Sequence, residues 1–568
     1  MSKNMSVNLT GNDDASVRSY VKSGQPYVWV TAAAVTVSII ITVGLLGLIA
    51  ARGMVHFWPD DMVQATYAQP GAQPQTILAE IRSTEAVTNA RLASAGLPVD
   101  EDQDIYGRNL IKIGNRDIFG VDFRYIVDEW LIDRSYPKDV VVFERDEWGN
   151  FHGFLDAVEV DGQRVEGAEA WKAYRVAQKR ATQLRKQIRK IEKGDIGRVN
   201  YAMDRIRLQE RGLNLKGVSR ENDPGAFTAF DQRRAELDAE YAILAETRRD
   251  LYRQLNRDVL NVRAIDGRTL NLTMGKVISG YQPNSMNVLQ KTGAWFVNFW
   301  KFVSGEPREA NTEGGIFPAI FGTVMMVLLM SVFVTPFGIL AALYLREYAK
   351  QGAVTRAIRI AVNNLAGVPS IVYGMFGLGF FVYTLGGNLD RLFYPEAAPA
   401  PVFGTPGILW ASLTLAILTL PVVIVATEEG LSRIPRALRE ASLSLGATKA
   451  ETLWRVVLPM ASPAMMTGLI LAIARAAGEV APLMLVGVVK LAPNLPFDLN
   501  FPFLHLERKF MHLGFHIYDV GFQSPNVEAA RPLVYATSFL LVMVILVLNL
   551  TAVTIRNRLR EKYKALEN

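Results

Sequence analysis

The chain has 568 residues, of which 50% are hydrophobic and 20% are charged, so it is more apolar than an ordinary soluble protein. It has no cysteine, which excludes disulfide bonds, thiolate metal sites and cysteine nucleophiles. The net charge of +6 is too small for this length to indicate nucleic-acid binding, and membrane proteins collect Lys and Arg on cytoplasmic loops in any case. We therefore expect a membrane part and a separate charged domain.

Six stretches are long and apolar enough to cross a bilayer as helices. The first, 28–50, is too long for the apolar part of a signal peptide, and no clear cleavage site follows it. We therefore interpret it as a transmembrane helix. The other five expected spans are 316–345, 360–387, 408–427, 464–489 and 533–555.

The distribution of Lys and Arg orients these spans. The loops after spans two and four and the C-terminal tail are rich in both residues, whereas the loops after spans three and five contain few. By the positive-inside rule, both termini are expected in the cytoplasm. The chain is then divided into a cytoplasmic N-terminus (1–27), transmembrane helix 1 (28–51), an extracytoplasmic insertion domain (52–315), and a core with transmembrane helices 2–6 (316–568).

The insertion is predicted to contain both strands and helices. Short strands are expected at 139–143 and 151–160, and hairpin turns at Asp161-Gly162 and Asp266-Gly267. A lone histidine, His152, is expected to be structural rather than a ligand. No catalytic set of residues is evident in this region.

A long charged stretch within the insertion, 165–258, keeps an apolar three-four spacing in two blocks, which predicts two helices. The segment 211–225 interrupts the pattern with Asn-Asp-Pro-Gly. We expect an antiparallel, coiled-coil-like hairpin on a small β-containing base. The apolar stripe is either the seam of the hairpin or a surface for a partner.

The loop that follows the fourth span, 428–461, predicts two short helices joined by a sharp turn. Gly446 suits the left-handed position that ends the first helix. Thr448 and Glu451 form a T-x-x-E capping box that begins the second. We expect Pro459 to end this second helix, with span five beginning beyond it. Such a unit can move as a rigid body and transmit force to a span.

This loop resembles the EAA loop of ABC-importer permeases, whose pattern is Glu-Ala-Ala, three residues, Gly, nine residues, and then an aliphatic residue, any residue, Leu and Pro. The chain matches every fixed position but one, where Ser442 replaces the second alanine. The resemblance implies that the short helix docks on a cytoplasmic ATPase subunit; the alternative is an ordinary amphipathic connector. The residues assigned to ATPase coupling are Glu440, Ala441, Ser442, Gly446, Val456, Leu458 and Pro459.

Span five contains a charge pair. Arg475 and Glu479 are four residues apart and are expected on one helix face. An arginine within a membrane span is costly, which favours a function, and its planar guanidinium matches the oxygens of phosphate. We interpret the pair as an anion contact on a transport path, in which Glu479 holds the guanidinium in place. A structural ion pair between helices is the alternative.

The sequence around this pair is similar to the PstA-type permeases of bacterial phosphate importers. The segment 458–483 reads L-P-x-A-x-P-x-x-x-T-G and then A-R-A-x-G-E-x-A-P-L, whereas the sister PstC type lacks the Ala-Pro. Val480 departs from the usual Thr. The segments 366–374 and 515–558 are also similar, but the insertion lies outside the resemblance.

The resemblance implies an all-α polytopic membrane protein with the ABC-importer permease fold, carrying an α+β extracytoplasmic insertion. It implies a PstC-like second permease, a PstB-like ATPase dimer, a PstS-like phosphate-binding protein and membrane lipid as partners, in the bacterial inner membrane. The chain has no G-x-x-x-x-G-K-[ST], so ATP and Mg²⁺ are expected on the ATPase and no cofactor or metal on this chain. The alternatives are transport of another oxyanion, such as sulfate or molybdate, and a membrane sensor that uses the external domain.

Overall fold

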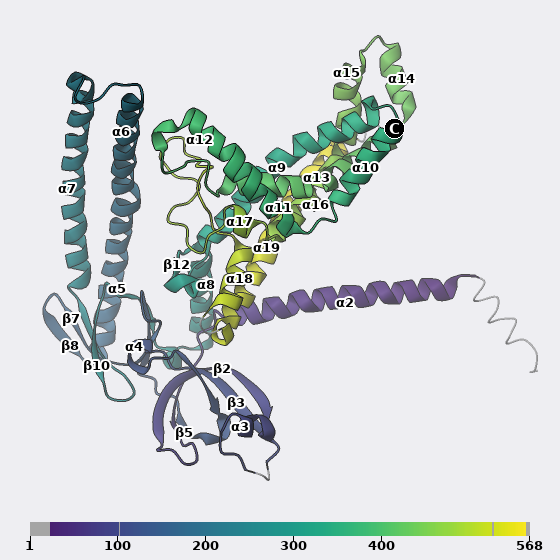
Figure 1. Ribbon diagram of the computed structural model, residues 1–568. Helices are drawn as coiled ribbons and strands as arrows, with labels where there is room; N and C mark the ends of the chain where they lie inside the picture. Colours follow the sequence, from purple (N-terminus) through teal and green to yellow (C-terminus); the bar gives the residue numbers. More distant parts are fainter. Residues whose placement is uncertain (1–22, 101–102, 525–526, 564–568) are drawn as a thin grey trace, which may run out of the picture.

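The computed structural model describes residues 23–100, 103–524 and 527–563. Figure 1 shows a bundle of long helices that is joined at one end to a part containing β-sheets, from which a long helical hairpin rises. The helices after residue 316 make the bundle, and the helix α2 (Gln25–Val55) projects away from it (Figure 1). The residues between them make the sheets and the hairpin.

Within the described residues, six helices are long and apolar enough to cross a membrane. They are Tyr27–Val55, Phe317–Tyr348, Ser370–Phe393, Ile408–Arg433, Lys449–Gly478 and Ala530–Lys562. The first of them is exposed over its apolar length and meets the bundle near its end, where Gly53 abuts the backbone of Tyr535. The chain is therefore a polytopic membrane protein.

The bundle is made of helices with several π-helical turns. Its elements are α9 (Phe317–Leu343), η6 (Tyr344–Tyr348), α10 (Ala353–Leu365), α11 (Ser370–Phe376), η7 (Gly377–Gly386), α12 (Gly387–Phe393), η8 (Pro395–Ala397), α13 (Ile408–Arg433), α14 (Arg436–Ser444), α15 (Lys449–Thr452), η9 (Leu453–Val457), α16 (Leu458–Gly478), α17 (Leu483–Val486), α18 (Leu513–Tyr518), η10 (Asp519–Gln523) and α19 (Val527–Tyr563). The central core packs α9, α13 and α16 together through Met326, Leu415 and Ala472.

Two of the expected spans are interrupted. The third, expected at 360–387, breaks after Leu365, and a new helix begins at Ser370. The residue before a proline disfavours the helical conformation, so Pro369 prevents a continuous helix here. The fifth, expected to reach Val489, ends at Gly478, and Glu479 is extended with φ −76° and ψ 133°.

Within the described residues, the insertion contains two large antiparallel sheets and the short β12–β13 pair. One has the strand order β4-β3-β2-β1-β5, and the other has β10-β9-β7-β6-β11 with β8 on β7. Their strands are β1 (Met62–Tyr67), β2 (Gln75–Thr88), β3 (Ile105–Lys112), β4 (Phe123–Val127), β5 (Leu131–Ser135), β6 (Val140–Arg145), β7 (Phe151–Val160), β8 (Gln163–Glu166), β9 (Val259–Arg263), β10 (Thr269–Thr273) and β11 (Val277–Tyr281).

The first sheet makes the β part of the insertion larger than the small base that the sequence predicts. Its strands escaped prediction because their burial does not alternate regularly. The register of β2 against β3 shifts between Ile81 and Ser83, and that of β1 against β5 shifts between Gln64 and Thr66. Such bulges move side chains to the other face and break the period of two.

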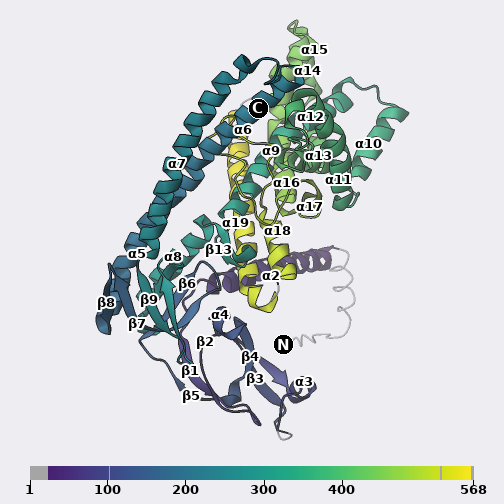
Figure 2. The same ribbon diagram turned by 60° about the vertical axis from the view of Figure 1, so that its left-hand side comes forward.

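The hairpin consists of α5 (Ala168–Arg189), a π-helical turn η2 (Lys190–Ile196), α6 (Gly197–Leu215), η3 (Pro224–Phe227) and α7 (Thr228–Asn256). Helix α5 lies on the second sheet, where Tyr174 contacts Phe143. Figure 2 shows α6 and α7 running as a rod from this base alongside the bundle. The expected interruption at 211–225 begins later, because α6 continues to Leu215 and ends before Gly217, whose φ is 85°.

Short elements connect these parts: α3 (Asn89–Ser94), α4 (Arg116–Phe119), η1 (Asp128–Trp130), η4 (Pro283–Ser285), α8 (Val288–Ser304), β12 (Pro307–Arg308), η5 (Glu309–Asn311) and β13 (Glu313–Gly314). The helix α8 begins with a capping box in which Asn287 and Gln290 bond each other's backbone. It leads through the β12–β13 pair into α9.

His152 on β7 is buried where the two sheets meet. Neither ring nitrogen has a hydrogen-bond partner among the described residues. Its Nε2 atom lies 4.0 Å from Oε1 of Glu80 on β2. Burial lowers the pKa of His152 to about 4, so the ring is neutral in the folded protein near neutral pH. The expectation of a structural role fits this position.

We expect this histidine to make the insertion sensitive to acid. A folded-state pKa below the ordinary 6.5 adds stability that is complete above pH 6.5 and is lost as the pH falls towards 4. The loss amounts to about 2 kcal/mol near pH 5. Thermal unfolding of the full chain in detergent measures it, with His152→Leu as the reference that lacks the titrating group.

The comparison with His152→Leu also removes the effect of other groups. Burial raises the pKa of Asp60 to about 6, which acts in the opposite direction with pH, but Asp60 is present in both proteins. The stability of the wild type relative to the variant should therefore fall between pH 7.5 and about pH 5. An unchanged difference would show that His152 is not held neutral.

Candidate functional site

The breaks in spans three and five lie against each other. Gly374 of α11 packs so closely on Pro482 that a Cβ atom on Gly374 would lie 2.7 Å from the Pro482 Cα. Tyr373 bridges the break in its own span by donating a hydrogen bond of 2.5 Å to the carbonyl of Leu365. Irregular backbone inside a membrane is tolerated only where it is buried in protein or lines a cavity. The two motifs singled out in the sequence, 366–374 and 474–483, therefore meet at one place.

Arg475 and Glu479 lie at this junction. Nε of Arg475 is 3.6 Å from Oε1 of Glu479, so the charges are paired but the distance is too long for a good hydrogen bond. The expectation of one shared helix face is only approximate, because α16 ends between the two residues. The side chain of Arg475 is 34% exposed.

Most of the residues around Arg475 on α16 have small side chains or none. Ala472, Ala476 and Ala477 are buried in the bundle core, and no atom lies within 4 Å of where a Cβ of Gly478 would stand. Small side chains allow close helix packing or a narrow passage. The guanidinium of Arg475 is partly exposed and is only loosely paired with the Glu479 carboxylate. Its N–H groups can therefore donate hydrogen bonds to the oxygens of an oxyanion.

The loop after span four forms the predicted pair of helices. Gly446 has a φ of 87°, which confirms its left-handed conformation. The Thr448 hydroxyl accepts a hydrogen bond from the backbone N–H of Glu451, and the Glu451 carboxylate accepts one from the N–H of Thr448, so the capping box is confirmed. Leu445, at the tip of α14, is 89% exposed.

Ser442, the one departure from the EAA pattern, has a structural use. Its hydroxyl lies 2.9 Å from that of Thr452, so the two side chains tie α14 to α15. Glu440 and Ala441 are exposed on the same short helix, while Leu458 is buried beneath the loop and Val456 is half-buried. The loop thus has an anchored side, where Leu458 packs on the spans and Val456 is half-buried, and an open side, where Glu440 and Ala441 face outward.

The expected end of a helix at Pro459 is wrong. Helices α15, η9 and α16 follow one another without a gap, from Lys449 to Gly478. A proline in a helix removes one backbone hydrogen bond and crowds the preceding turn. Here the preceding turn is the π-helical η9, whose wider hydrogen-bond spacing accommodates Pro459 at the start of α16.

Arg439 fastens α14 to the end of α9. Its guanidinium donates to the carbonyls of Leu431 and Ile434 at 2.8 and 3.0 Å and to Oε1 of Glu347 in η6 at 3.0 Å. Lys449 reaches the same turn, where its ammonium donates to the carbonyl of Glu347. Sequence reasoning counted these residues only for their charge, because nothing in the pattern connected them to Glu347.

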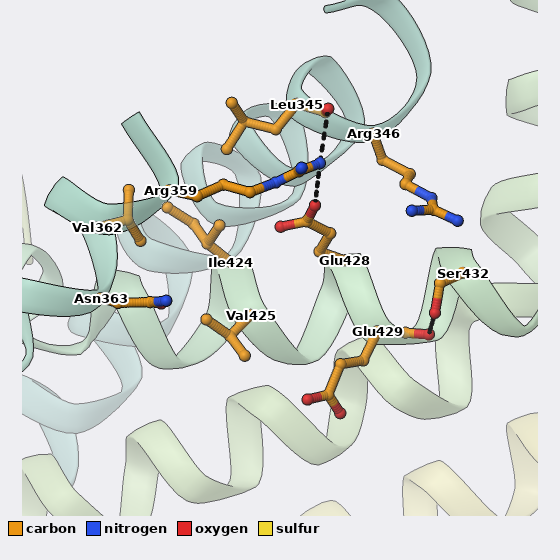
Figure 3. Close-up of a pocket in the computed structure, with 10 residues that line it drawn as sticks. All are labelled: Leu345, Arg346, Arg359, Val362, Asn363, Ile424, Val425, Glu428, Glu429 and Ser432. Atoms are coloured by element: carbon orange, nitrogen blue, oxygen red, sulfur yellow. Dashed lines mark hydrogen bonds and ion pairs between the residues drawn. The ribbon is translucent and has the colours of Figure 1, made fainter. Parts of the chain in front are cut away.

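A cleft of about 250 Å³ lies beside this anchored side (Figure 3). Arg359 of α10 crosses it, with an ion pair of 2.5 Å to Glu428 of α13 and a hydrogen bond of 3.3 Å to the carbonyl of Leu345. Arg346 and Glu429 line the cleft and have no ion pair among the described residues. The cleft is close to η6, which Arg439 and Lys449 contact, and Arg475 is not among the residues that line it.

The opposite end of the bundle touches the hairpin. The Tyr201 hydroxyl of α6 donates to the carbonyl of Phe501, and its ring lies 6.5 Å from that of His505. Helix α6 also packs against η8, in the loop between spans three and four. The insertion and the two loops that are poor in Lys and Arg therefore lie at one end of the bundle, and α14 and α15 lie at the other (Figures 1 and 2).

Comparison with known proteins agrees with this arrangement. A family model described as the inner membrane component of binding-protein-dependent transport systems matches residues 334–564. The phosphate transport system permease protein PstA 1 of Mycobacterium tuberculosis (strain CDC 1551 / Oshkosh) is 35% identical over 245 residues, which cover 43% of this chain and 71% of that protein. The chain belongs to this family of permeases.

Other matches cover a similar part of the permease. The probable ABC transporter permease protein YqgI of Bacillus subtilis (strain 168) is 32% identical over 260 residues, which cover 44% of the permease and 81% of the relative. A chain of the MetNI methionine ABC transporter in an inward-facing conformation matches with a TM-score of 0.32 and 18% identity, over 43% of the permease and 95% of that chain. The insertion lies outside the residues that the family model matches.

Family membership fixes the general role. The permease is a multi-pass inner-membrane subunit of an ABC importer and resembles the PstA type. It is a transport subunit rather than an enzyme. Importers of this family work with an ATPase and with a binding protein outside the membrane.

Proposed function

We propose that the permease forms part of the path for inorganic phosphate in an ATP-driven importer. Its partners are then a PstC-like second permease, a PstB-like ATPase dimer, which binds ATP and Mg²⁺, and a PstS-like phosphate-binding protein. The phosphate transport permeases among the relatives support this substrate. Phosphate uptake with sulfate and molybdate as competitors tests it, since a phosphate path predicts that neither competitor slows uptake at equal concentration.

The position of Arg475 carries this proposal. The guanidinium is partly exposed where two interrupted spans meet. Its Nε atom lies 3.6 Å from the Glu479 carboxylate, so the two side chains are not tightly paired. Interrupted helices are a recurring way of placing polar groups at a substrate site within a membrane. Phosphate in transit would contact Arg475, with Glu479 limiting the orientation of the fork. A loose contact suits passage because firm binding would slow release.

One continuous helix can couple this site to ATP hydrolysis. The helical path from Lys449 to Gly478 starts beside Gly446 and ends next to Arg475. At 1.5 Å per residue its length is about 44 Å. Movement of α14 on the ATPase would therefore be passed along this helix to the phosphate contact. Glu440 and Ala441, on the open side of α14, would face the ATPase.

The proposed topology places both termini and α14 in the cytoplasm and the insertion in the periplasm. The contacts of Tyr201 with the loop after span five support it, because that loop is poor in Lys and Arg. The separation of α14 from the sheets along the bundle also supports it (Figure 1). The long insertion contains many charges, but long domains are translocated largely regardless of charge.

Replacing Arg439 by alanine should loosen the coupling of ATP hydrolysis to transport. The substitution removes three hydrogen bonds to η6 and to the end of α13, so α14 can move without moving the spans. We expect a drop in uptake of about tenfold, with ATP hydrolysis by the reconstituted importer retained. Arg436→Ala is the matched control, because Arg436 is exposed on the same helix. Equal uptake by both variants would contradict the anchoring role.

A further inference from the structure

The helix α8, between the sheets and the second span, has two faces of opposite character. Its inner face is fixed to the end of α2: the Trp295 indole donates to the carbonyl of Met54 at 2.7 Å, and Asn298 donates to the carbonyl of Phe57 at 3.2 Å. Lys291 is buried and forms an ion pair of 2.5 Å with Asp61. These contacts hold α8 where the chain leaves the first span.

The outer face of α8 is apolar and uncovered. Its exposed apolar side chains are Val288 (72%), Leu289 (83%), Phe296 (63%), Val297 (53%) and Trp300 (68%). At 100° per residue they fall on one half of the helix. The other residues on this half are Thr292, Gly293, Phe299, Val303 and Ser304, so the face carries no charge. Gln290 and Lys301, both exposed, lie at its edge.

The position of α8 identifies what covers this face. It contacts the end of α2 at Met54 and the segment just after it at Phe57. The segment 305–316 joins it to α9, and Ile316, immediately before α9, donates its N–H to the carbonyl of Phe302 in α8 at 2.8 Å. Both neighbours are membrane spans, so α8 lies at the level where the chain crosses the bilayer surface. Aromatic residues gather at this level, and amphipathic helices with Trp and Phe on one face lie flat in it.

We infer that α8 is an interfacial membrane helix, whose Leu289, Phe296 and Trp300 insert into the lipid next to spans one and two. The membrane then fixes the base of the insertion directly, in addition to the two chain connections. Because α5 and the sheets are attached to this base, lipid contact at α8 also sets how the hairpin lies over the loops after spans three and five. The inference depends on the membrane spans and not on the transported substrate.

Single spin labels test this on the full chain, which has no native cysteine to remove. The chain is reconstituted into vesicles of phosphatidylethanolamine and phosphatidylglycerol with one cysteine at Leu289, Phe296 or Trp300, or at the control positions Gln290 and Lys301. Relaxation by oxygen reports contact with lipid, and relaxation by a water-soluble nickel chelate reports contact with water. We expect the first three labels to respond mainly to oxygen and the two controls mainly to nickel.

A second variant keeps the test independent of any one label. Phe296→Glu places a charge in the middle of the face, which should shift a label at Leu289 from oxygen towards nickel accessibility. Nickel accessibility at Leu289, Phe296 and Trp300 alike would overturn the inference. Labels that are shielded from both reagents would also overturn it and would show that a protein surface, such as a second copy of the chain, covers the face.

Discussion

Gly446→Val should abolish phosphate uptake while leaving the spans inserted in the membrane. The glycine has a φ of 87°, a conformation that costs a residue with a Cβ about 1–2 kcal/mol and a β-branched residue more. Nothing lies within 4 Å of where its Cβ would stand, so the effect comes from the backbone and not from a clash. The turn would open, and α14 would leave its place against α15. Uptake assays with membrane expression measured in parallel show the effect.

Three further variants separate the backbone effect from other causes. Gly446→Asn should keep most activity, because asparagine tolerates the left-handed region, and Gly446→Ala should be intermediate. The matched control is Gly352→Val at the start of α10, where the backbone is extended with φ −159° and no atom lies within 4 Å of a Cβ. Wild-type uptake by the Gly446→Val variant would show that this turn is not needed to couple ATP hydrolysis to transport.

Arg475→Gln should reduce uptake about 10- to 100-fold, the range expected for losing a hydrogen bond to a charged group. The loop that we propose to contact the ATPase lies at the other end of the helix Lys449–Gly478, so ATP hydrolysis should continue in the reconstituted importer. Arg475→Lys should retain part of the uptake, because the charge remains but the planar fork is lost. Initial rates over a range of phosphate concentrations separate weaker binding from slower turnover.

Arg346→Gln is the matched control for this substitution. Arg346 is exposed, has no ion pair among the described residues and lies at the coupling end of the bundle. It should transport at the wild-type rate. Glu479→Gln should have a smaller effect than Arg475→Gln, because the two side chains are 3.6 Å apart and loosely held. Full uptake by the Arg475→Gln variant would show that the Arg475–Glu479 ion pair is structural and does not contact phosphate.

The elements that were predicted well are those with short-range signals. The spans are long apolar runs, and the Gly446 turn and the Thr448–Glu451 box each depend on residues within a few positions of one another. Local chemistry decides such features, so the sequence alone was sufficient.

Most of the elements that were missed depend on residues far apart in the chain. The sheet β4-β3-β2-β1-β5 has bulges that hide its alternation, and the π-helical turn before Pro459 allows a helix to continue where a proline suggested its end. The contact of Arg439 with Glu347 joins residues 92 positions apart. The meeting of Gly374 and Pro482 likewise follows from packing between spans and has no signature in either segment.

The amphipathic character of α8 was present in the sequence but was not recognised. Its apolar residues stand between charged neighbours and are too few for a span. What distinguishes it is that its apolar side remains open in the folded chain, which only the structure reveals.

We propose that this permease moves phosphate through a path that includes Arg475. Uptake of labelled phosphate by a bacterial strain that lacks this chain and any other phosphate importer tests it most directly, with sulfate uptake as the control and membrane expression checked for each protein. We predict that the wild-type chain restores phosphate uptake, that Arg475→Gln restores about 10- to 100-fold less, and that sulfate uptake is the same in every strain. Unchanged phosphate uptake without the chain, or equal rescue by both proteins, would contradict this account.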